Sequence, residues 1–194
     1  MSYHNIIQIS IFSGGFLIKT FPLNGKWTLC GGGYRTEGTI PGSVYSFLLD
    51  AELIDEPFYR DNELQALALM DNEFTFTRTF SYHAENKVFL HCDGLDTLCD
   101  IYINGSHIAY TYNMHRVWAI DISDILTDGE NQIKLVFHPV DRYIKEKQAQ
   151  KLLPPVSTDS MVGFPHIRKA HCMMGWDWGP YVGTDTARNG LPQM

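Results

Sequence analysis

The chain has 194 residues, 44% of them hydrophobic and 13% aromatic, enough to bury about 70% of the surface that the unfolded chain exposes. Its 19% charged residues, 16 glycines and 9 prolines are ordinary for a globular domain, which excludes disorder and fibrous repeats. The net charge of -7 would repel a phosphate backbone, so nucleic acid is not an expected partner.

The most apolar stretch, residues 6–18, is interrupted by Gln8, Ser10 and Ser13. A membrane span needs about 18 consecutive apolar residues, so we expect no membrane partner. The stretch also lacks the basic region and the small-residue cleavage pattern of a secretory signal, which favours a cytoplasmic protein. Whether residues 1–22 add a strand to the domain is left open.

Short helices are predicted at residues 43–49 and 62–70, where apolar side chains recur at helical spacing. From residue 73 to residue 137 the pattern changes to alternation. Phe74, Phe76 and Phe80 share one face of a strand, and three later segments repeat the period of two, at residues 88–92, 99–103 and 131–137.

Two dipeptides predict tight turns within this region. Asn104-Gly105 favours a type I′ turn between residues 100–103 and 106–112, and Asp128-Gly129 precedes the last strand. Because short strands follow one another without long helices between them, the sequence predicts an all-β fold, an antiparallel β-sandwich with a few short connecting helices. A third, charged helix is expected at residues 140–152, followed by an irregular stretch at residues 157–165.

No metal site or other cofactor is expected. The four cysteines have no C-x-x-C pair and are interpreted as buried free thiols, and His91, His107 and His115 lack the spacing of metal ligands. The acidic residues beside Gly94 are interpreted as turn-forming and capping residues without a catalytic role; they are Asp93, Asp96 and Asp100.

Three segments carry a resemblance to a known family. They are Ile-Pro-Gly-Ser-Val at 40–44, Gly-Leu-Asp-Thr at 94–97 leading into Ile-Tyr-Ile-Asn-Gly at 101–105, and His-Ile-Arg-Lys-Ala at 166–170 running into Gly-Trp-Asp-Trp-Gly-Pro at 175–180. Together they resemble family 2 glycoside hydrolases, and more narrowly the N-terminal jelly-roll domain of the β-mannosidases, which is galactose-binding-domain-like. Residues 24–27 and 113–115 fit the same pattern.

The resemblance implies a sandwich domain over residues 23–180, with residues 1–22 as an N-terminal extension and residues 181–194 as a divergent tail. It also implies that an immunoglobulin-like domain and a (β/α)₈ barrel follow in the parent enzyme. That barrel is the expected partner of this domain, and its two glutamates hydrolyse terminal β-mannosides with retention. Neither glutamate has a counterpart here, so the 194 residues alone are expected to be inactive.

By the same resemblance, Asp177 contacts hydroxyls of the bound mannose from a Trp-Asp-Trp loop. A carboxylate accepts hydrogen bonds from neighbouring hydroxyls, and the indoles of Trp176 and Trp178 offer apolar faces to sugar C–H groups. Arg168 could orient Asp177 or reach the sugar itself. Lys169 is expected to be a solvated charge. The alternative is that both tryptophans are core residues and that Asp177 caps a turn.

Family members continue after Gly-Pro with a Gly-Ile-Trp-Arg-type strand, which residues 181–194 do not match. We therefore expect the closing strand to be missing and one sheet edge to be unpaired. Three functions remain open: a non-catalytic domain of a β-mannosidase, a free-standing carbohydrate-binding module for mannose-terminated glycans, and a structural domain without a ligand.

Overall fold

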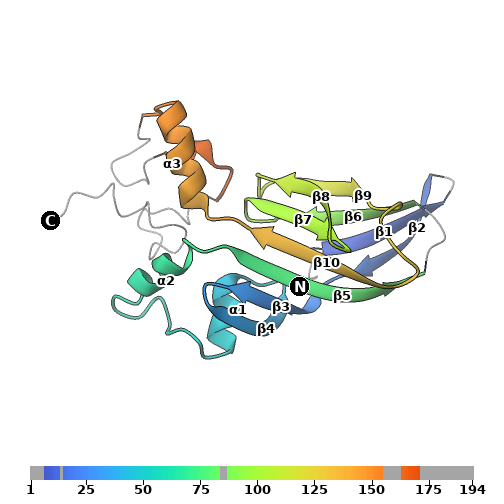
Figure 1. Cartoon of the computed structure of the whole chain (residues 1–194), viewed down its shortest axis with the longest axis horizontal. Coiled ribbons are helices and arrows are strands. Elements are labelled where there is room, and N and C mark those ends of the chain that lie inside the picture. Colours follow the sequence, from blue (N-terminus) through green and yellow to red (C-terminus); the bar gives the residue numbers. More distant parts are fainter. Residues whose placement is uncertain (1–6, 14, 84–86, 155–162, 171–194) are drawn as a thin grey trace.

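The computed structural model describes residues 7–13, 15–83, 87–154 and 163–170, and these form two antiparallel sheets with short helices at one end (Figure 1). The smaller sheet has four strands in the order β2-β1-β6-β9. Their bounds are Ile7–Ser13 for β1, Phe16–Pro22 for β2, Lys87–Asp93 for β6 and Val117–Asp121 for β9.

The larger sheet has six strands in the order β4-β3-β5-β10-β7-β8. Their bounds are Gly25–Gly31 for β3, Tyr34–Ile40 for β4, Phe74–Tyr82 for β5, Cys99–Ile103 for β7, Ser106–Thr111 for β8 and Gly129–Phe137 for β10. Every strand pair in the described residues is antiparallel, which confirms the all-β sandwich expected from the sequence.

The core lies between the two sheets, and the inward-facing side chains of the alternating strands fill it. Val88 and Leu90 point inward from β6, and Ile133 and Leu135 point inward from β10, while the residues between them face outward. On β5, Arg78 shares the face of Phe76, and its guanidinium donates a 2.7 Å hydrogen bond to the Leu23 carbonyl. One cation therefore lies in the middle of β5, on the face that otherwise carries aromatic side chains, and the main-chain oxygens of Leu23 and Asn24 accept its hydrogen bonds.

Residues 7–22, whose contribution the sequence left open, supply strands β1 and β2. Ile7 and Ile9 are 1% and 2% exposed in the core, and β1 pairs with β6 from Ile7 to Phe12. Because β1 lies between β2 and β6, the described part of this segment is integral to the smaller sheet.

The predicted turn and helices are present. Asn104 and Gly105 have φ values of 51° and 81°, as a type I′ turn requires, and they join β7 to β8. The helices are α1 at Val44–Asp50, α2 at Glu63–Leu69, α3 at Val140–Gln150 and a 3₁₀ turn at Phe164–His166. No helix in the described residues is long and apolar enough to span a bilayer.

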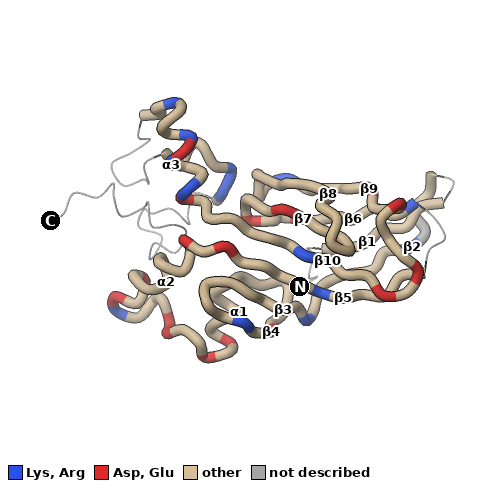
Figure 2. Tube along the Cα trace, in the orientation of Figure 1, with Lys and Arg blue, Asp and Glu red and all other residues tan. Residues whose placement is uncertain are grey.

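Helix α1 packs on β4 through a glycine. A Cβ atom at Gly38 would lie 2.5 Å from ring carbons of Phe47, so only glycine allows this approach. The Phe47 ring then meets Phe76 edge to face, with centroids 5.2 Å apart. Charged residues of both signs are spread along the chain rather than gathered into one field (Figure 2).

Cysteine burial agrees with the sequence expectation at Cys92 and Cys99 but not at Cys30. Cys92 and Cys99 are buried free thiols, and burial raises the pKa of both, which makes them poor nucleophiles. Cys30 is half-buried and also free. Cys172 lies outside the described residues. Residues 181–194 also lie outside them, so the expectation that they lack the closing strand stays a prediction.

Candidate functional site

The three segments that carry the family resemblance meet at one pocket of about 230 Å³. Its lining includes the last residue of β4, the first residue of β5 and the first residues of α1 and α3. Its walls are mainly apolar, with a few polar groups among them. Residues of the three segments that line it are Ile40, Pro41, Gly42, Ser43, Val44, Gly94, Leu95, Asp96 and Lys169.

The first wall is the connection from β4 to α1. A Cβ atom at Gly42 would lie 2.5 Å from the Thr39 carbonyl oxygen, so the tight path of the chain requires glycine. Ser43 then caps α1: the Ser46 N–H donates to its hydroxyl at 3.2 Å, and its own N–H donates to the Ser46 hydroxyl at 2.7 Å. Gly42 and Ser43 of the Pro-Gly-Ser segment thus have structural roles in this wall: Gly42 permits the tight turn, and Ser43 caps α1.

The second wall combines the turn at Gly94 with Lys169. Lys169 is only 6% exposed, and its ammonium group forms an ion pair with Asp96, whose other carboxylate oxygen accepts a hydrogen bond from the Thr97 hydroxyl. The expectation that Lys169 is a solvated charge is therefore wrong. The reason is that the backbone at Arg168 forms a parallel β-bridge with Asn113. In this arrangement the Arg168 side chain points outward, and the side chain of the next residue, Lys169, points inward.

The segment carrying Lys169 is fastened on both sides. Before it, Phe164 and Ile167 pack with Leu98 and Ile144 in a second apolar cluster. Around it, the Met114 N–H donates to the Arg168 carbonyl at 3.0 Å, and the Ala170 N–H approaches the Met114 sulfur at 2.9 Å. Residues 113–115, which fit the family pattern, are thus an architectural support for residues 168–170.

Of the four predicted sugar-contacting residues, the structure describes only Arg168. Arg168 is exposed, and its backbone rather than its side chain makes the contacts with residues 113 and 114. Trp176, Asp177 and Trp178 lie outside the described residues, as does any contact between Arg168 and Asp177. Their assignment therefore stays a prediction.

A polar network that the sequence did not predict borders the pocket at His138. Its Nδ1 lies 2.9 Å from Glu73 Oε2 and its Nε2 lies 2.7 Å from Asp100 Oδ2. His107 Nε2 lies 2.6 Å from the other oxygen of Asp100. Partial burial alone would raise the pKa of Asp100, but the hydrogen bonds to both histidines and their charges outweigh it and lower that pKa.

The histidines and aspartates singled out in the sequence have separate surroundings. Asp96 and Asp100 engage Lys169 and the histidines, so their side chains are not simply turn-forming. On the outward side of β6, His91 Nε2 and Asp93 Oδ1 are buried and have no hydrogen-bond partner within the described part of the chain. The residues described here contain no group of three or more His, Cys, Asp or Glu side chains that could hold a metal ion.

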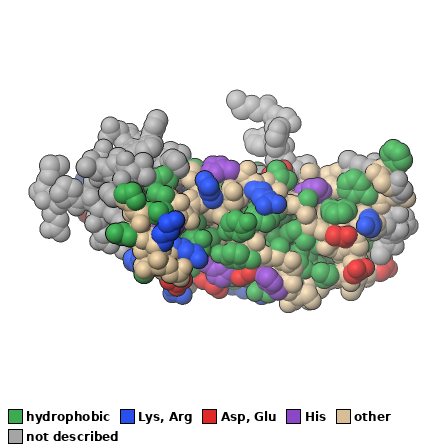
Figure 3. Space-filling model, turned by 90° about the horizontal axis from the view of Figure 1, so that it is seen from above, with side chains coloured by type: hydrophobic (Ala, Val, Ile, Leu, Met, Phe, Trp, Pro, Cys, Tyr) green, Lys and Arg blue, Asp and Glu red, His purple; other side chains and the backbone are tan. Residues whose placement is uncertain are grey.

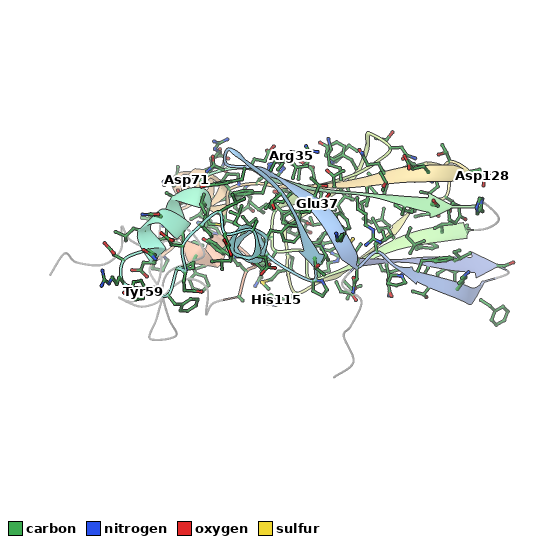
Figure 4. The ribbon with its side chains drawn as sticks, turned by 90° about the horizontal axis from the view of Figure 1, so that it is seen from below. Arg35, Glu37, Tyr59, Asp71, His115 and Asp128 are labelled. Carbon is green, nitrogen blue, oxygen red and sulfur yellow. The ribbon has the colours of Figure 1, made fainter. Side chains whose placement is uncertain are left out.

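The pocket can accommodate an apolar group rather than a large polar ligand. Its volume lies below the range of about 300–1,000 Å³ that is usual for small-molecule clefts. Figure 3 shows apolar side chains mixed with histidine and basic side chains on the face seen from above, and Figure 4 places Asp71 at the helical end and Asp128 at the opposite end. The described residues thus form the walls of the pocket and support them.

Comparison with known proteins connects this architecture to enzymes that act on sugars. Residues 26–185 match the family model for the glycosyl hydrolase 2 galactose-binding domain-like fold. β-Mannosidase from Mus musculus is 30% identical over 93% of the chain but only 22% of its own length, and probable β-mannosidase from Caenorhabditis elegans is 31% identical over 76% of the chain and 18% of its own length.

A solved structure gives the same relation in three dimensions. The β-D-mannosidase from Dictyoglomus thermophilum superposes with a TM-score of 0.76 at 27% identity, covering 83% of this chain and 20% of that enzyme. The chain therefore spans about a fifth of the length of the relatives it matches.

Proposed function

Because the chain belongs to the glycosyl hydrolase 2 galactose-binding domain-like family, we propose that it is the N-terminal, non-catalytic domain of a retaining β-mannosidase. The observation that carries this proposal is that 93% of the chain aligns with a β-mannosidase while only 22% of that enzyme is covered. The remaining part of such an enzyme would contain the barrel, where one glutamate acts as acid/base and another as nucleophile. The substrate would be a terminal β-D-mannoside.

In this proposal the domain contributes a loop to the mannose subsite. Asp177 accepts hydrogen bonds from mannose hydroxyls, and Trp176 and Trp178 limit the space around the sugar ring. Arg168 orients the Asp177 carboxylate or contacts the sugar directly. None of these residues performs a bond-breaking step, because their part is to bind and orient the substrate for groups in the barrel.

The anchoring of residues 163–170 supports this role. Lys169 is paired with Asp96 inside the pocket wall, and the backbone on either side is hydrogen-bonded to Met114. These contacts therefore hold the backbone of residues 168–170 in place, and Ala170 lies seven residues before Asp177. A substrate-contacting loop needs such a rigid base, since small displacements of a binding group reduce the rate strongly.

A chimeric enzyme tests the proposal. The segment of murine β-mannosidase that aligns with this chain is replaced by the chain, and kcat/KM for an aryl β-D-mannoside is measured with and without Asp177→Asn. We expect Asp177→Asn to lower kcat/KM by about 100-fold, because a buried polar contact with the sugar is lost. Asp128→Asn, a change at the opposite end of the sandwich, is the control and should have no effect. An active chimera that tolerates Asp177→Asn would contradict the role given to this residue.

Two measurements on the 194-residue chain separate the remaining alternatives. The proposal predicts no release of chromophore from an aryl β-mannoside. Binding of methyl β-D-mannoside to the chain alone, abolished by Asp177→Ala, would instead support a free-standing carbohydrate-binding module. A chimera that is active with Asp177 replaced, together with no binding by the chain, would leave a structural domain without a ligand as the better description.

A further inference from the structure

His138 lies between two carboxylates, and each of its ring nitrogens is within hydrogen-bond distance of one of them. Nδ1 is 2.9 Å from Glu73 Oε2, and Nε2 is 2.7 Å from Asp100 Oδ2. A neutral imidazole has only one N–H group, and an ionised carboxylate can only accept. Both hydrogen bonds therefore exist together only when His138 is an imidazolium.

The other histidine in the network does not have this requirement. His107 approaches Asp100 through Nε2 at 2.6 Å, and one N–H group is enough for that bond, so a neutral His107 can make it. Asp100 is kept ionised by its partners, because the hydrogen bonds from the two histidines outweigh the effect of burial and lower its pKa. Within this network, His138 is thus the histidine that needs a proton on both ring nitrogens to make its contacts.

The position of His138 gives this contact a structural consequence. It directly follows β10, which lies between β5 and β7, and its backbone N–H donates to the Leu98 carbonyl at 2.9 Å. Glu73 directly precedes β5, and Asp100 belongs to β7. The charged side chain therefore joins three adjacent strands at the end where α3 begins, and it also lines the pocket.

We propose that His138 is a proton-dependent clamp: its imidazolium holds Glu73 and Asp100 together, and loss of the proton releases Glu73 and loosens residues 70–73. The Glu73 side chain is 56% exposed against 23% for Asp100, so water replaces the bond to Glu73 more readily. The neutral ring keeps its N–H toward Asp100 and turns a lone pair toward Glu73, which repels that carboxylate.

Loosening at this place reaches the pocket. Residues 70–73 connect α2 to β5, and Met70 and Asn72 are part of the pocket wall. The clamp therefore makes the shape of one wall depend on the protonation of His138. Besides its two partners, the described titratable and charged groups that share a pocket lining or the polar network with His138 are Tyr45, Asp71, Asp96, His107, Tyr110, Arg142, Tyr143, Glu146 and Lys169.

NMR of the ¹⁵N-labelled 194-residue chain tests this inference without reference to the proposed function. Imidazole ¹⁵N spectra are followed from pH 5 to pH 9 for His138 and for His83, which lies 3.0 Å from Asp128 at the opposite end of the sandwich. We expect the amides of residues 70–73 to shift together when His138 loses its second ring proton, because the bond to Glu73 is then lost.

Two variants complete the test. Glu73→Gln removes the charge of an exposed side chain and should abolish the coupled shift of these amides, whereas Asp128→Asn should leave it unchanged. The clamp would be overturned if the amides of residues 70–73 did not respond when His138 loses its second ring proton. The same conclusion would follow if Glu73→Gln left that response unchanged.

Discussion

Lys169 is a charged side chain in an interior position, and its environment explains why it can be there. Its ammonium group is paired with Asp96, and the same carboxylate accepts a hydrogen bond from the Thr97 hydroxyl. A buried ion pair adds little to stability over an apolar pair, but removal of one partner leaves the other charge uncompensated. The pair therefore favours one particular arrangement of the pocket wall.

Lys169→Met is expected to lower the free energy of unfolding by about 2–3 kcal/mol, because Asp96 would lose its partner while remaining mostly buried. Urea denaturation measures the change, and Lys26→Met on the exposed side of β3 is the control. The double variant Asp96→Asn with Lys169→Met should recover part of the loss, since no unpaired charge remains. A double variant that loses the full sum of the two single effects would argue against direct pairing.

Asp100 gives the domain a defined dependence on acid. Its pKa is lower in the folded chain than the ordinary value of about 3.9, so the stability that it contributes is present above that value and is lost as the pH falls through the folded pKa. Thermal unfolding of Asp100→Asn should therefore occur at a lower temperature than that of the unmodified chain at pH 6, and the difference should shrink below about pH 4. An equal difference at pH 6 and pH 2.5 would contradict this account. Asp128→Asn is the matched exposed carboxylate.

At the scale of elements, the contact of α1 with β4 depends on the absence of a side chain. Phe47 lies where the Cβ atom of residue 38 would be, only 2.5 Å from its ring carbons. Helix and strand are linked by a turn that itself requires Gly42. Displacement of α1 would therefore change the pocket wall that the same turn forms.

Gly38→Ala should destabilise the domain by about 1–3 kcal/mol, because the added methyl group forces Phe47 and α1 outward. Chemical denaturation can be compared with Glu37→Ala, an exposed neighbour on β4 (Figure 4). Replacement of Phe47 by leucine in the Gly38→Ala background should relieve part of the strain. If Gly38→Ala is as stable as the unmodified chain, α1 does not pack on β4 as closely as described.

The elements that the sequence predicted are those whose signals are local. Phe74 and Phe76 alternate with threonines and lie on the inner face of β5, and Asn104-Gly105 is sufficient to specify the turn between β7 and β8. Residues 1–22 lie outside the family resemblance, so the sequence did not decide whether they add a strand. Ser10 nevertheless is only 5% exposed, so burial at this point does not follow the polarity of the side chain.

The site was less predictable for a physical reason. Asp96 and Lys169 are 73 residues apart. The carboxylate partners of His138 come from the residue before β5 and from β7, so no spacing in the sequence predicts either contact. The family resemblance identified the segments that line the pocket and also Trp176, Asp177 and Trp178. It could not show that Lys169 points inward, because the sequence Arg168-Lys169-Ala170 does not distinguish a buried lysine from a solvated one.

At the scale of the whole molecule, the described part of residues 1–22 belongs to the sandwich. Strand β1 covers the core with Ile7 and Ile9 and lies inside the smaller sheet. Removal of residues 1–22 should therefore prevent cooperative folding, since it exposes β6 as a new sheet edge and opens the core.

Near-ultraviolet circular dichroism and urea titration of a chain lacking residues 1–22 measure this loss. Phe16→Ser, which replaces a side chain that is 79% exposed, is the control and should keep the cooperative transition. A shortened chain that still unfolds in one sharp transition would mean that β1 and β2 are dispensable to the sandwich.

The account as a whole depends on a catalytic barrel encoded beyond the residues studied, because the chain spans about a fifth of the β-mannosidases it matches. Nucleotide sequence downstream of codon 194 in the source gene, translated in all three frames, tests this most directly. We predict an immunoglobulin-like segment and then a βα-repeating barrel with two glutamates placed for retaining hydrolysis. Unrelated sequence in every frame would contradict the assignment of this domain to a β-mannosidase.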